Sequence, residues 1–125
     1  MYVLTVEDGF SSAHQLLGYR GKCENLHGHN WRVVLSVRGS TLDERGLLLD
    51  FNDLKSILKR VTGELDHKNL NELAPFRSSN PSSENIARHI AERVHNELAA
   101  RVGSDAVLES VTVWESETAR CTFTP

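Results

Sequence analysis

In the segment His27-Gly28-His29-Asn30-Trp31-Arg32-Val33-Val34-Leu35-Ser36-Val37-Arg38, apolar residues largely alternate with polar ones from Trp31 onward. A period of two predicts a β-strand, which we place at His29 to Arg38. The apolar face of this strand is formed by Trp31, Val33, Leu35 and Val37. His27 and His29 share the parity of that face, so both imidazoles should point toward whatever covers it. The segment therefore predicts a strand that leads into a partly enclosed site.

Two other segments have helical periodicity, with apolar residues three and four positions apart. The first helix is expected to follow its N-cap, Asp50, and to run through about Thr62, with Gly63 as its stop. The second is expected to begin near Asn80-Pro-Ser-Ser-Glu84 and to run to Val102. The chain between the two helices lacks a sustained period and predicts a structured loop.

Strands are also expected from Tyr2 to Ala13, from Leu108 to Glu115 and roughly from Ala119 to Phe123. The resulting order is β-β-α-α-β-β. It predicts a single α+β domain over residues 1–125, with a four-stranded antiparallel sheet that carries both helices on one face. Neighbouring subunits commonly cover the open edges of such a sheet, which favours an oligomer.

The composition is that of an ordinary globular protein, with 39% hydrophobic and 25% charged residues. The net charge of −3 argues against a nucleic-acid-binding protein, and no apolar run reaches the length of a membrane span. The N-terminal residues lack the basic region of a signal peptide. We therefore expect a cytoplasmic enzyme in which Cys23 and Cys121 stay reduced.

His14, at the end of the first expected strand, offers a third imidazole to His27 and His29. If the two strands are antiparallel neighbours, His14 can reach the other two rings. Three histidines with one open position are the arrangement of a catalytic zinc ion, and zinc is favoured over other borderline metals. The alternative is that His14 is a loop histidine with local hydrogen bonds. The pattern of three histidines on adjoining strands favours the metal.

Cys23 admits three interpretations. It could be a fourth zinc ligand, which would close the site and make it structural. It could be a buried, inert thiol, or a nucleophile or base beside the metal. Its polar neighbours Lys22 and Glu24 argue against burial. The spacing alone does not decide between ligand and base.

Three further groups could carry chemistry. Asp66 and His67 form an acid–imidazole pair that could serve Cys23 as a proton partner, although Asp66 could also simply cap a turn. The run Ser82-Ser83-Glu84 reads as a helix cap that could also contact an anion. Glu115, at a strand end, is either solvated or holds a heterocyclic amine through two hydrogen bonds.

Six motifs follow one another along the chain. They are Phe10-Ser-Ser-Ala-His14, Cys23-x3-His27-Gly-His29-Asn30, Leu49-Asp50-Phe51, Leu65-Asp66-His67-Lys-Asn69-Leu70, Asn80-Pro-Ser-Ser-Glu84-Asn85 and Val113-Trp114-Glu115. In this order they resemble the 6-pyruvoyltetrahydropterin synthase superfamily, and most closely its bacterial branch, the 6-carboxytetrahydropterin synthases of queuosine biosynthesis. The resemblance covers nearly the whole chain.

The resemblance implies the tunnelling fold (T-fold), in which trimers close their sheets into a barrel and two trimers stack into a homohexamer. It also implies an active site at a subunit interface and assigns residues to three tasks. The implied zinc ligands are His14, His27 and His29. The implied catalytic residues are Cys23, Asp66 and His67. The implied substrate-binding residues are Glu115 as the pterin anchor and Ser82, Ser83 and Glu84, which border the pocket from a neighbouring subunit.

The implied activity is that of a lyase. It converts 7,8-dihydroneopterin triphosphate to 6-carboxy-5,6,7,8-tetrahydropterin and releases triphosphate and acetaldehyde. The three-residue gap between Cys23 and His27 favours this branch over the pyruvoyl synthases, in which the gap is longer. Another branch uses a glutamate base in this segment and cleaves the side chain to 6-hydroxymethyl-7,8-dihydropterin for folate, so Glu24 keeps that activity open. A non-enzymatic alternative is a zinc-stabilised binding domain with Cys23 as the fourth ligand.

Overall fold

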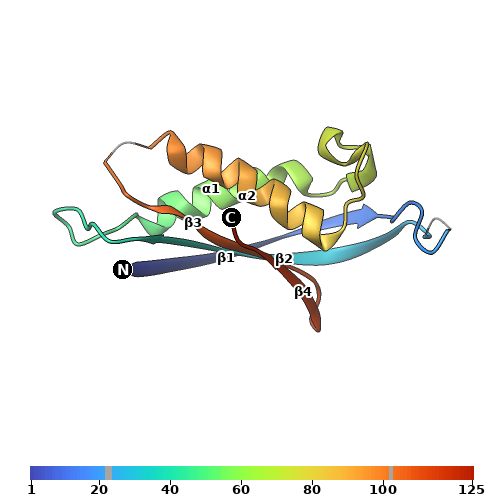
Figure 1. Cartoon of the computed structure of the whole chain (residues 1–125), viewed down its shortest axis with the longest axis horizontal. Coiled ribbons are helices and arrows are strands. Elements are labelled where there is room, and N and C mark those ends of the chain that lie inside the picture. Colours follow the sequence, from blue (N-terminus) through green and yellow to red (C-terminus); the bar gives the residue numbers. More distant parts are fainter. Residues whose placement is uncertain (22–23, 102) are drawn as a thin grey trace.

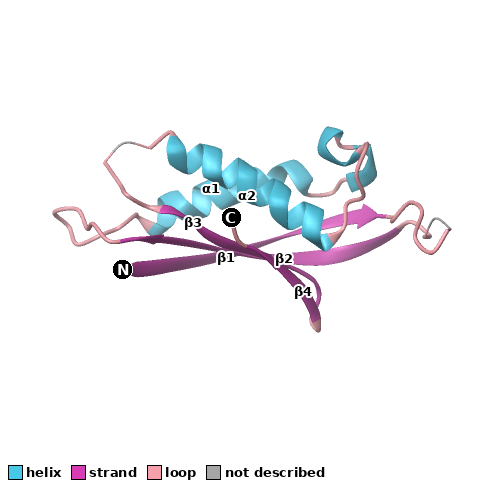
Figure 2. Ribbon diagram, in the orientation of Figure 1, coloured by secondary structure: helices cyan, strands magenta, loops and turns pink. Residues whose placement is uncertain are grey.

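Four strands form one antiparallel sheet, in the spatial order β1-β2-β3-β4, and two helices lie side by side on one face of it (Figure 1). The structure is a computed structural model that describes residues 1–21, 24–101 and 103–125. Its elements are β1 (Tyr2–His14), β2 (His27–Gly39), α1 (Phe51–Leu65), η1 (Leu70–Glu72), η2 (Ala74–Phe76), α2 (Ser83–Ala99), β3 (Val107–Ser116) and β4 (Ala119–Phe123). The predicted α+β order and the single helical layer are confirmed (Figure 2).

The core lies between the sheet and the helices. The predicted apolar face of β2 is confirmed, because its four members expose at most 1% of their surface: Trp31, Val33, Leu35 and Val37. Helix α1 contributes buried Leu54, Ile57 and Leu58, and α2 contributes Ile86 and Ile90. The apolar faces of the elements therefore pack together, with α1 against β1 and α2 against β3 and β4.

The end of helix α1 differs from the prediction. Asp50 is the N-cap as expected, with its Oδ1 accepting a hydrogen bond from the Asn52 N–H at 2.8 Å. The expected stop at Gly63 is wrong, because the helix continues through this residue to Leu65. Leu65 is 1% exposed, so its burial holds the last turn and overrides the weak helix propensity of glycine.

Helix α2 begins as predicted and ends earlier. Ser82 is its N-cap, with its Oγ accepting from the Asn85 N–H at 3.2 Å. The helix ends at Ala99, and the predicted end, Val102, lies outside the described residues. The predicted structured loop between the helices contains the two short 3-10 helices. No helix among residues 1–21, 24–101 and 103–125 combines the length and the apolar character needed to cross a bilayer.

Strands β1 and β2 are longer than predicted at the end that matters for function. β1 includes His14, and β2 begins at His27, so both residues have strand geometry. The antiparallel register pairs His14 with His27 and Ser12 with His29. The predicted pairing of these two strands is thereby confirmed, and it brings distant parts of the sequence to one end of the sheet.

Candidate metal centre and active site

Three imidazoles gather where β1 and β2 meet their connecting loop. One nitrogen from each of His14, His27 and His29 can be chosen so that all lie within 4.8 Å of one another. His14 is 2% exposed and its Nε2 lies 3.1 Å from the Nε2 of His27. Because every second residue of a strand faces the same side, His27 and His29 point to the face that the helices cover. These three residues could hold a metal ion.

Hydrogen bonds fix which ring nitrogen carries the proton in neutral His14 and in neutral His27. The Nδ1 of His14 lies 2.8 Å from the carbonyl oxygen of Pro81, and the Nδ1 of His27 lies 2.7 Å from that of Asn25. A carbonyl oxygen only accepts, so both Nδ1 atoms donate, and in the neutral rings both Nε2 atoms bear lone pairs. Two lone pairs 3.1 Å apart repel each other unless a cation lies between them.

The spacing of these nitrogens fits a tetrahedral metal. Nitrogen ligands about 2.0–2.1 Å from zinc lie roughly 3.3 Å apart at tetrahedral angles. The 3.1 Å separation of the two Nε2 atoms is close to that value. Carbonyl acceptors on the second ring nitrogen are also the usual support of metal-bound histidine. The donor set therefore has the geometry that a bound metal requires, and in the neutral rings of His14 and His27 the Nε2 atoms offer it lone pairs.

His29 supplies an independent sign of a missing partner. Its Nε2 is buried and has no hydrogen-bond partner among the described residues, although Glu115 Oε1 lies 3.5 Å away. Burial lowers the pKa of His29, and the negative charge of Glu115 opposes this effect only in part. A buried, neutral nitrogen without a partner costs free energy, which a metal ligand bond would remove.

Trp31 forms the apolar side of the cluster. Its ring lies edge-on to His14 and His29, with centroids 5.0 and 5.1 Å away. The indole Nε1 donates to the carbonyl oxygen of Ser12 at 3.2 Å, which fixes the orientation of the ring. An apolar neighbour lowers the local dielectric and restricts water, and so strengthens electrostatic effects at the histidines.

Glu115 lies beside the histidines from the third strand. It follows Val111 and Val113 on the helix-covered side of β3, and its Oε2 lies 3.3 Å from the hydroxyl of Ser83. The two residues therefore meet within one chain. Ser82, one residue earlier, is the N-cap of α2, and Glu84 occupies the first turn. The carboxylate is 38% exposed, so a ligand can reach it.

The predicted acid–imidazole pair also forms. Asp66 Oδ2 lies 2.9 Å from His67 Nδ1, while Asp66 Oδ1 accepts from the Ser11 N–H at 2.9 Å. The Ser11 N–H first, and then the His67 side chain, hold the pKa of Asp66 below its ordinary value. His67 has a φ of 54°, and its N–H donates to the Ser11 carbonyl at 2.7 Å. The turn is thus docked on β1 through Ser11, three residues before His14.

The loop between β1 and β2 carries the remaining predicted residues. Cys23 lies outside the described residues. Glu24 is half-buried, and its Oε1 accepts from the Leu16 N–H at 3.0 Å while its own N–H donates to the Leu16 carbonyl at 3.1 Å. The charge of Glu24 acts on His29 and raises its pKa against the effect of burial. Glu24 is therefore fixed against the residue that follows β1 by two positions, three residues before His27.

Several contributors to the site were not predicted. The carbonyl groups of Pro81 and Asn25 have no signal in the sequence, because every residue has a carbonyl. Trp31 could have been placed, since it lies two residues beyond His29 on the same strand face. The amides of Asn71 and Asn80, which bind the loop before Glu24, depend on contacts that only the folded chain reveals.

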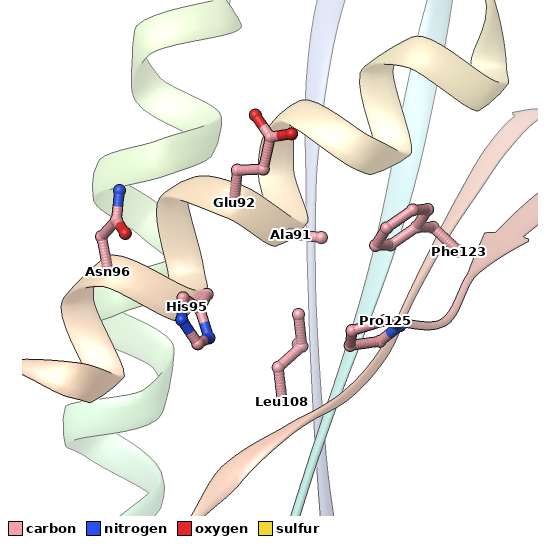
Figure 3. A pocket seen from close by; sticks show the side chains of 7 residues that line it. All are labelled: Ala91, Glu92, His95, Asn96, Leu108, Phe123 and Pro125. Carbon is pink, nitrogen blue, oxygen red and sulfur yellow. The ribbon is translucent and has the colours of Figure 1, made fainter.

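A separate hollow lies away from these residues. It is formed between α2 and the C-terminal strands and is lined by Ala91, Glu92, His95, Asn96, Leu108, Phe123 and Pro125 (Figure 3). None of the predicted site residues lines it. Its floor is largely apolar, and exposed polar side chains of α2 form its rim. We find no constellation of catalytic groups in this hollow among the described residues.

Comparison with known proteins identifies the family. The family model described as 6-pyruvoyl tetrahydropterin synthase matches residues 3–125. The chain belongs to this family. A 6-carboxy-5,6,7,8-tetrahydropterin synthase of Haemophilus influenzae is 30% identical over 98% of this chain and 99% of its own length. A dihydroneopterin monophosphate aldolase of Pyrococcus furiosus is 37% identical over 74% of this chain and 72% of its own.

The likeness extends to three dimensions. The solved structure of Caenorhabditis elegans 6-pyruvoyl tetrahydropterin synthase superposes on this chain with a TM-score of 0.80 and 29% sequence identity, covering 100% of this chain and 97% of that one. The T-fold and the resemblance inferred from the six motifs are therefore confirmed.

Proposed function

We propose that this member of the 6-pyruvoyl tetrahydropterin synthase family is a zinc-dependent lyase of queuosine biosynthesis. Its substrate would be 7,8-dihydroneopterin triphosphate, and its products 6-carboxy-5,6,7,8-tetrahydropterin, triphosphate and acetaldehyde, with one water consumed to balance the atoms. The observation that carries the proposal is a pair of Nε2 atoms, those of His14 and His27, which lie 3.1 Å apart and bear lone pairs in the neutral rings. Beside them, the Nε2 of His29 has no hydrogen-bond partner within the described part of the chain. The full-length likeness to the Haemophilus influenzae carboxytetrahydropterin synthase supports the choice of product.

Zinc would be held by His14, His27 and His29, and would act as a Lewis acid on side-chain oxygens of the substrate. Asp66 would keep His67 oriented through its 2.9 Å contact with Nδ1, leaving Nε2 of this exposed ring free to exchange a proton with the substrate. Cys23 would take or return a proton on the opposite side of the pterin side chain. Two acid–base groups on two sides allow a proton to leave one carbon and reach another.

Glu115 would anchor the pterin ring. A carboxylate with two oxygens can accept from a ring N–H and an exocyclic amine at once, and Ser83 donates to one of these oxygens from the start of α2. Because Glu115 also lies 3.5 Å from His29, an anchored ring would place its side chain next to the metal. Ser82 and Glu84 would border the same pocket.

The test uses purified protein loaded with zinc. It is incubated with 7,8-dihydroneopterin triphosphate, and products are identified by mass spectrometry. The proposal expects 6-carboxy-5,6,7,8-tetrahydropterin and acetaldehyde, and loss of turnover in His67→Ala with the zinc content retained. A 6-hydroxymethyl pterin as the main product, or full turnover in His67→Ala, would contradict it.

A second candidate function is cleavage of the side chain to 6-hydroxymethyl-7,8-dihydropterin for folate. The carboxylate of Glu24, held by the Leu16 N–H three residues before His27, favours it, as does the likeness to the aldolase of Pyrococcus furiosus. Glu24→Gln separates the two functions, because glutamine still accepts the Leu16 N–H but cannot act as a base. Selective loss of the hydroxymethyl product in this variant would assign the base to Glu24. A 6-pyruvoyl product would indicate the third branch.

The non-enzymatic alternative is a zinc-stabilised binding domain. It makes Cys23 a fourth ligand, whereas the lyase makes it a base. Cys23→Ala should abolish turnover and keep zinc if the lyase proposal holds, and should lose zinc and unfold if the thiol closes the site. The homohexamer built from two trimers and the cytoplasmic location stay predictions, which size measurement in solution and cell fractionation can test.

A further inference from the structure

Two asparagine side chains hold the chain where it leaves β1. The amide of Asn71 accepts from the Gln15 N–H at 2.9 Å and donates to the Gln15 carbonyl at 2.9 Å. The amide of Asn80 makes the same pair of bonds with Leu17, at 2.8 and 3.0 Å. Each amide therefore imitates the backbone of a neighbouring strand. We call these two interactions the amide clamps.

Between the clamps, Leu16 faces the other way. Its N–H and carbonyl both bond Glu24, through the carboxylate and the backbone N–H of that residue. The backbone N–H and carbonyl groups of Gln15, Leu16 and Leu17 thus point to alternate sides of the segment. A β-strand that is paired along both edges has the same pattern. Loss of either clamp frees the segment against which Glu24 is held.

The clamps come from the two other parts of the site. Asn71 belongs to η1, just after the Asp66–His67 turn, and its own N–H donates to the Asn69 side chain at 3.2 Å. Asn80 immediately precedes Pro81, whose carbonyl oxygen accepts from His14 Nδ1. The Asn71 clamp therefore connects the loop to the segment of the acid–imidazole pair. The Asn80 clamp connects it to the segment of Pro81, which holds the ring of His14.

We propose that Asn71 and Asn80 are positioning residues, which set the loop of Glu24 in register with the histidine cluster and the Asp66–His67 pair. The inference rests on the proposed function, because the reaction needs groups from all three segments at one substrate. It applies to either product, since both candidate reactions draw a base from this loop. Neither asparagine needs to touch the substrate. Misplacing catalytic groups by about 1 Å can cost roughly a hundredfold in rate.

The experiment compares Asn71→Ala and Asn80→Ala with Asn96→Ala in the zinc-loaded protein. Asn96 is an exposed residue of α2 at which alanine suits the helix, so it serves as the matched control. Hydrogen exchange followed by NMR reports on the amides of Gln15 and Leu17. Steady-state kinetics on 7,8-dihydroneopterin triphosphate gives kcat and KM, and mass spectrometry gives the zinc content.

We expect the amide of Gln15 to exchange faster in Asn71→Ala, and that of Leu17 in Asn80→Ala. In each variant kcat should fall about 10- to 100-fold while KM and zinc content stay close to those of the unaltered chain. The Asn96→Ala control should match the unaltered chain throughout. Faster exchange with an unaltered kcat, or a kcat loss that follows loss of zinc, would overturn the inference.

If an alanine variant does not fold, Asn71→Asp and Asn80→Asp take its place. Aspartate has nearly the same shape and still accepts the N–H, but it sets a carboxylate oxygen against the Gln15 or Leu17 carbonyl. The same fall in kcat is expected, and an unaltered kcat overturns the inference. Failure of the proposed function is seen separately, because it shows as absence of turnover in the unaltered chain.

Discussion

The two faces of the sheet differ in how fully their polar side chains are hydrogen-bonded to one another. On the face away from the helices, polar side chains of neighbouring strands form hydrogen-bonded pairs. These pairs are Thr5 with Ser36 at 2.9 Å, Glu7 with Arg32 at 2.6 Å, Ser11 with Asn30 at 2.7 Å and Thr112 with Thr122 at 2.7 Å. Each pair joins a donor to an acceptor, so each of these side chains has a hydrogen-bond partner without any ligand.

On the helix-covered face, the apolar residues of β2 are preceded by His27 and His29. Among the described residues, not every ring nitrogen there has a hydrogen-bond partner. In the neutral rings the Nε2 atoms of His14 and His27 both bear lone pairs, and that of His29 has no hydrogen-bond partner among the described residues. The same strands thus carry both arrangements. The contrast shows that an incomplete set of acceptors aimed at one point marks a binding site better than the mere presence of polar residues.

The largest effect is expected from His29→Ala. Removing one of three ligands should abolish metal binding and lower turnover roughly 10⁴-fold, or about 5 kcal/mol of transition-state stabilisation. Metal content measured by mass spectrometry and product formation check this. The control is Asn30→Ala, the next residue along β2 on the opposite face. Stoichiometric metal with normal turnover in His29→Ala would remove the histidine cluster from the mechanism.

The next effect concerns stability. Trp31 is 1% exposed and packs against Phe10 with ring centroids 5.8 Å apart, so Trp31→Ala should lower the free energy of unfolding by about 3–5 kcal/mol. Urea denaturation followed by circular dichroism measures the change. Arg32→Ala, one residue later on the open face, serves as the control. A loss below about 1 kcal/mol for Trp31→Ala would mean that the helix-covered face is less tightly packed than described.

A smaller effect is expected from Glu115→Gln. Glutamine has nearly the same shape but no charge, and its amide can accept only through one oxygen, so one bond to a pterin ring is lost. We expect kcat/KM to fall about 10- to 100-fold, since a hydrogen bond to a charged group contributes roughly 1.5–3 kcal/mol. Steady-state kinetics with unaltered metal content checks this. An unaltered kcat/KM would exclude Glu115 as the anchor.

The smallest effect is expected from Glu7→Gln on the open face. Its partner Arg32 is about half exposed, as is Glu7 itself, and Arg32 also lies 5.3 Å from the ring centroid of Trp114. The change should cost about 0.2–1 kcal/mol, and less at high salt, because exposed ion pairs are screened. Urea denaturation at two ionic strengths measures it. A loss of several kcal/mol would show that the polar pairs on the open face contribute substantially to the free energy of unfolding.

Local patterns in the sequence predicted most of the fold. Alternation in β2, the cap Asp50 and a cap within the run Ser82-Ser83-Glu84 are set by residues next to each other in the chain, and all three predictions are confirmed. The predicted end of α1 at Gly63 is wrong because it depends on distant contacts and not on neighbouring residues. The helix passes through this residue because Leu65 is buried by distant parts of the chain, which no local signal contains.

The features of the candidate site also fall into two groups, those that local sequence patterns predict and those that depend on distant contacts. The meeting of His14 with His27 follows from strand parity and register, so the sequence sufficed. The left-handed backbone of His67, the carbonyl of Pro81 and the two amide clamps depend on contacts between residues 55 to 67 positions apart. These contacts form only when η1 and the start of α2 reach the loop, and side-chain type alone does not specify them.

The hydrogen bond between His14 and Pro81 has a consequence for the order in which the protein is made. All three histidines belong to a hairpin that leaves the ribosome before α2, and the carbonyl that fixes the ring of His14 is 67 residues further along the chain. A nascent hairpin can therefore gather the three rings before one of them has its final orientation. We expect metal affinity to reach its full value only after α2 has docked, so that loading of the ion would report that this docking has taken place.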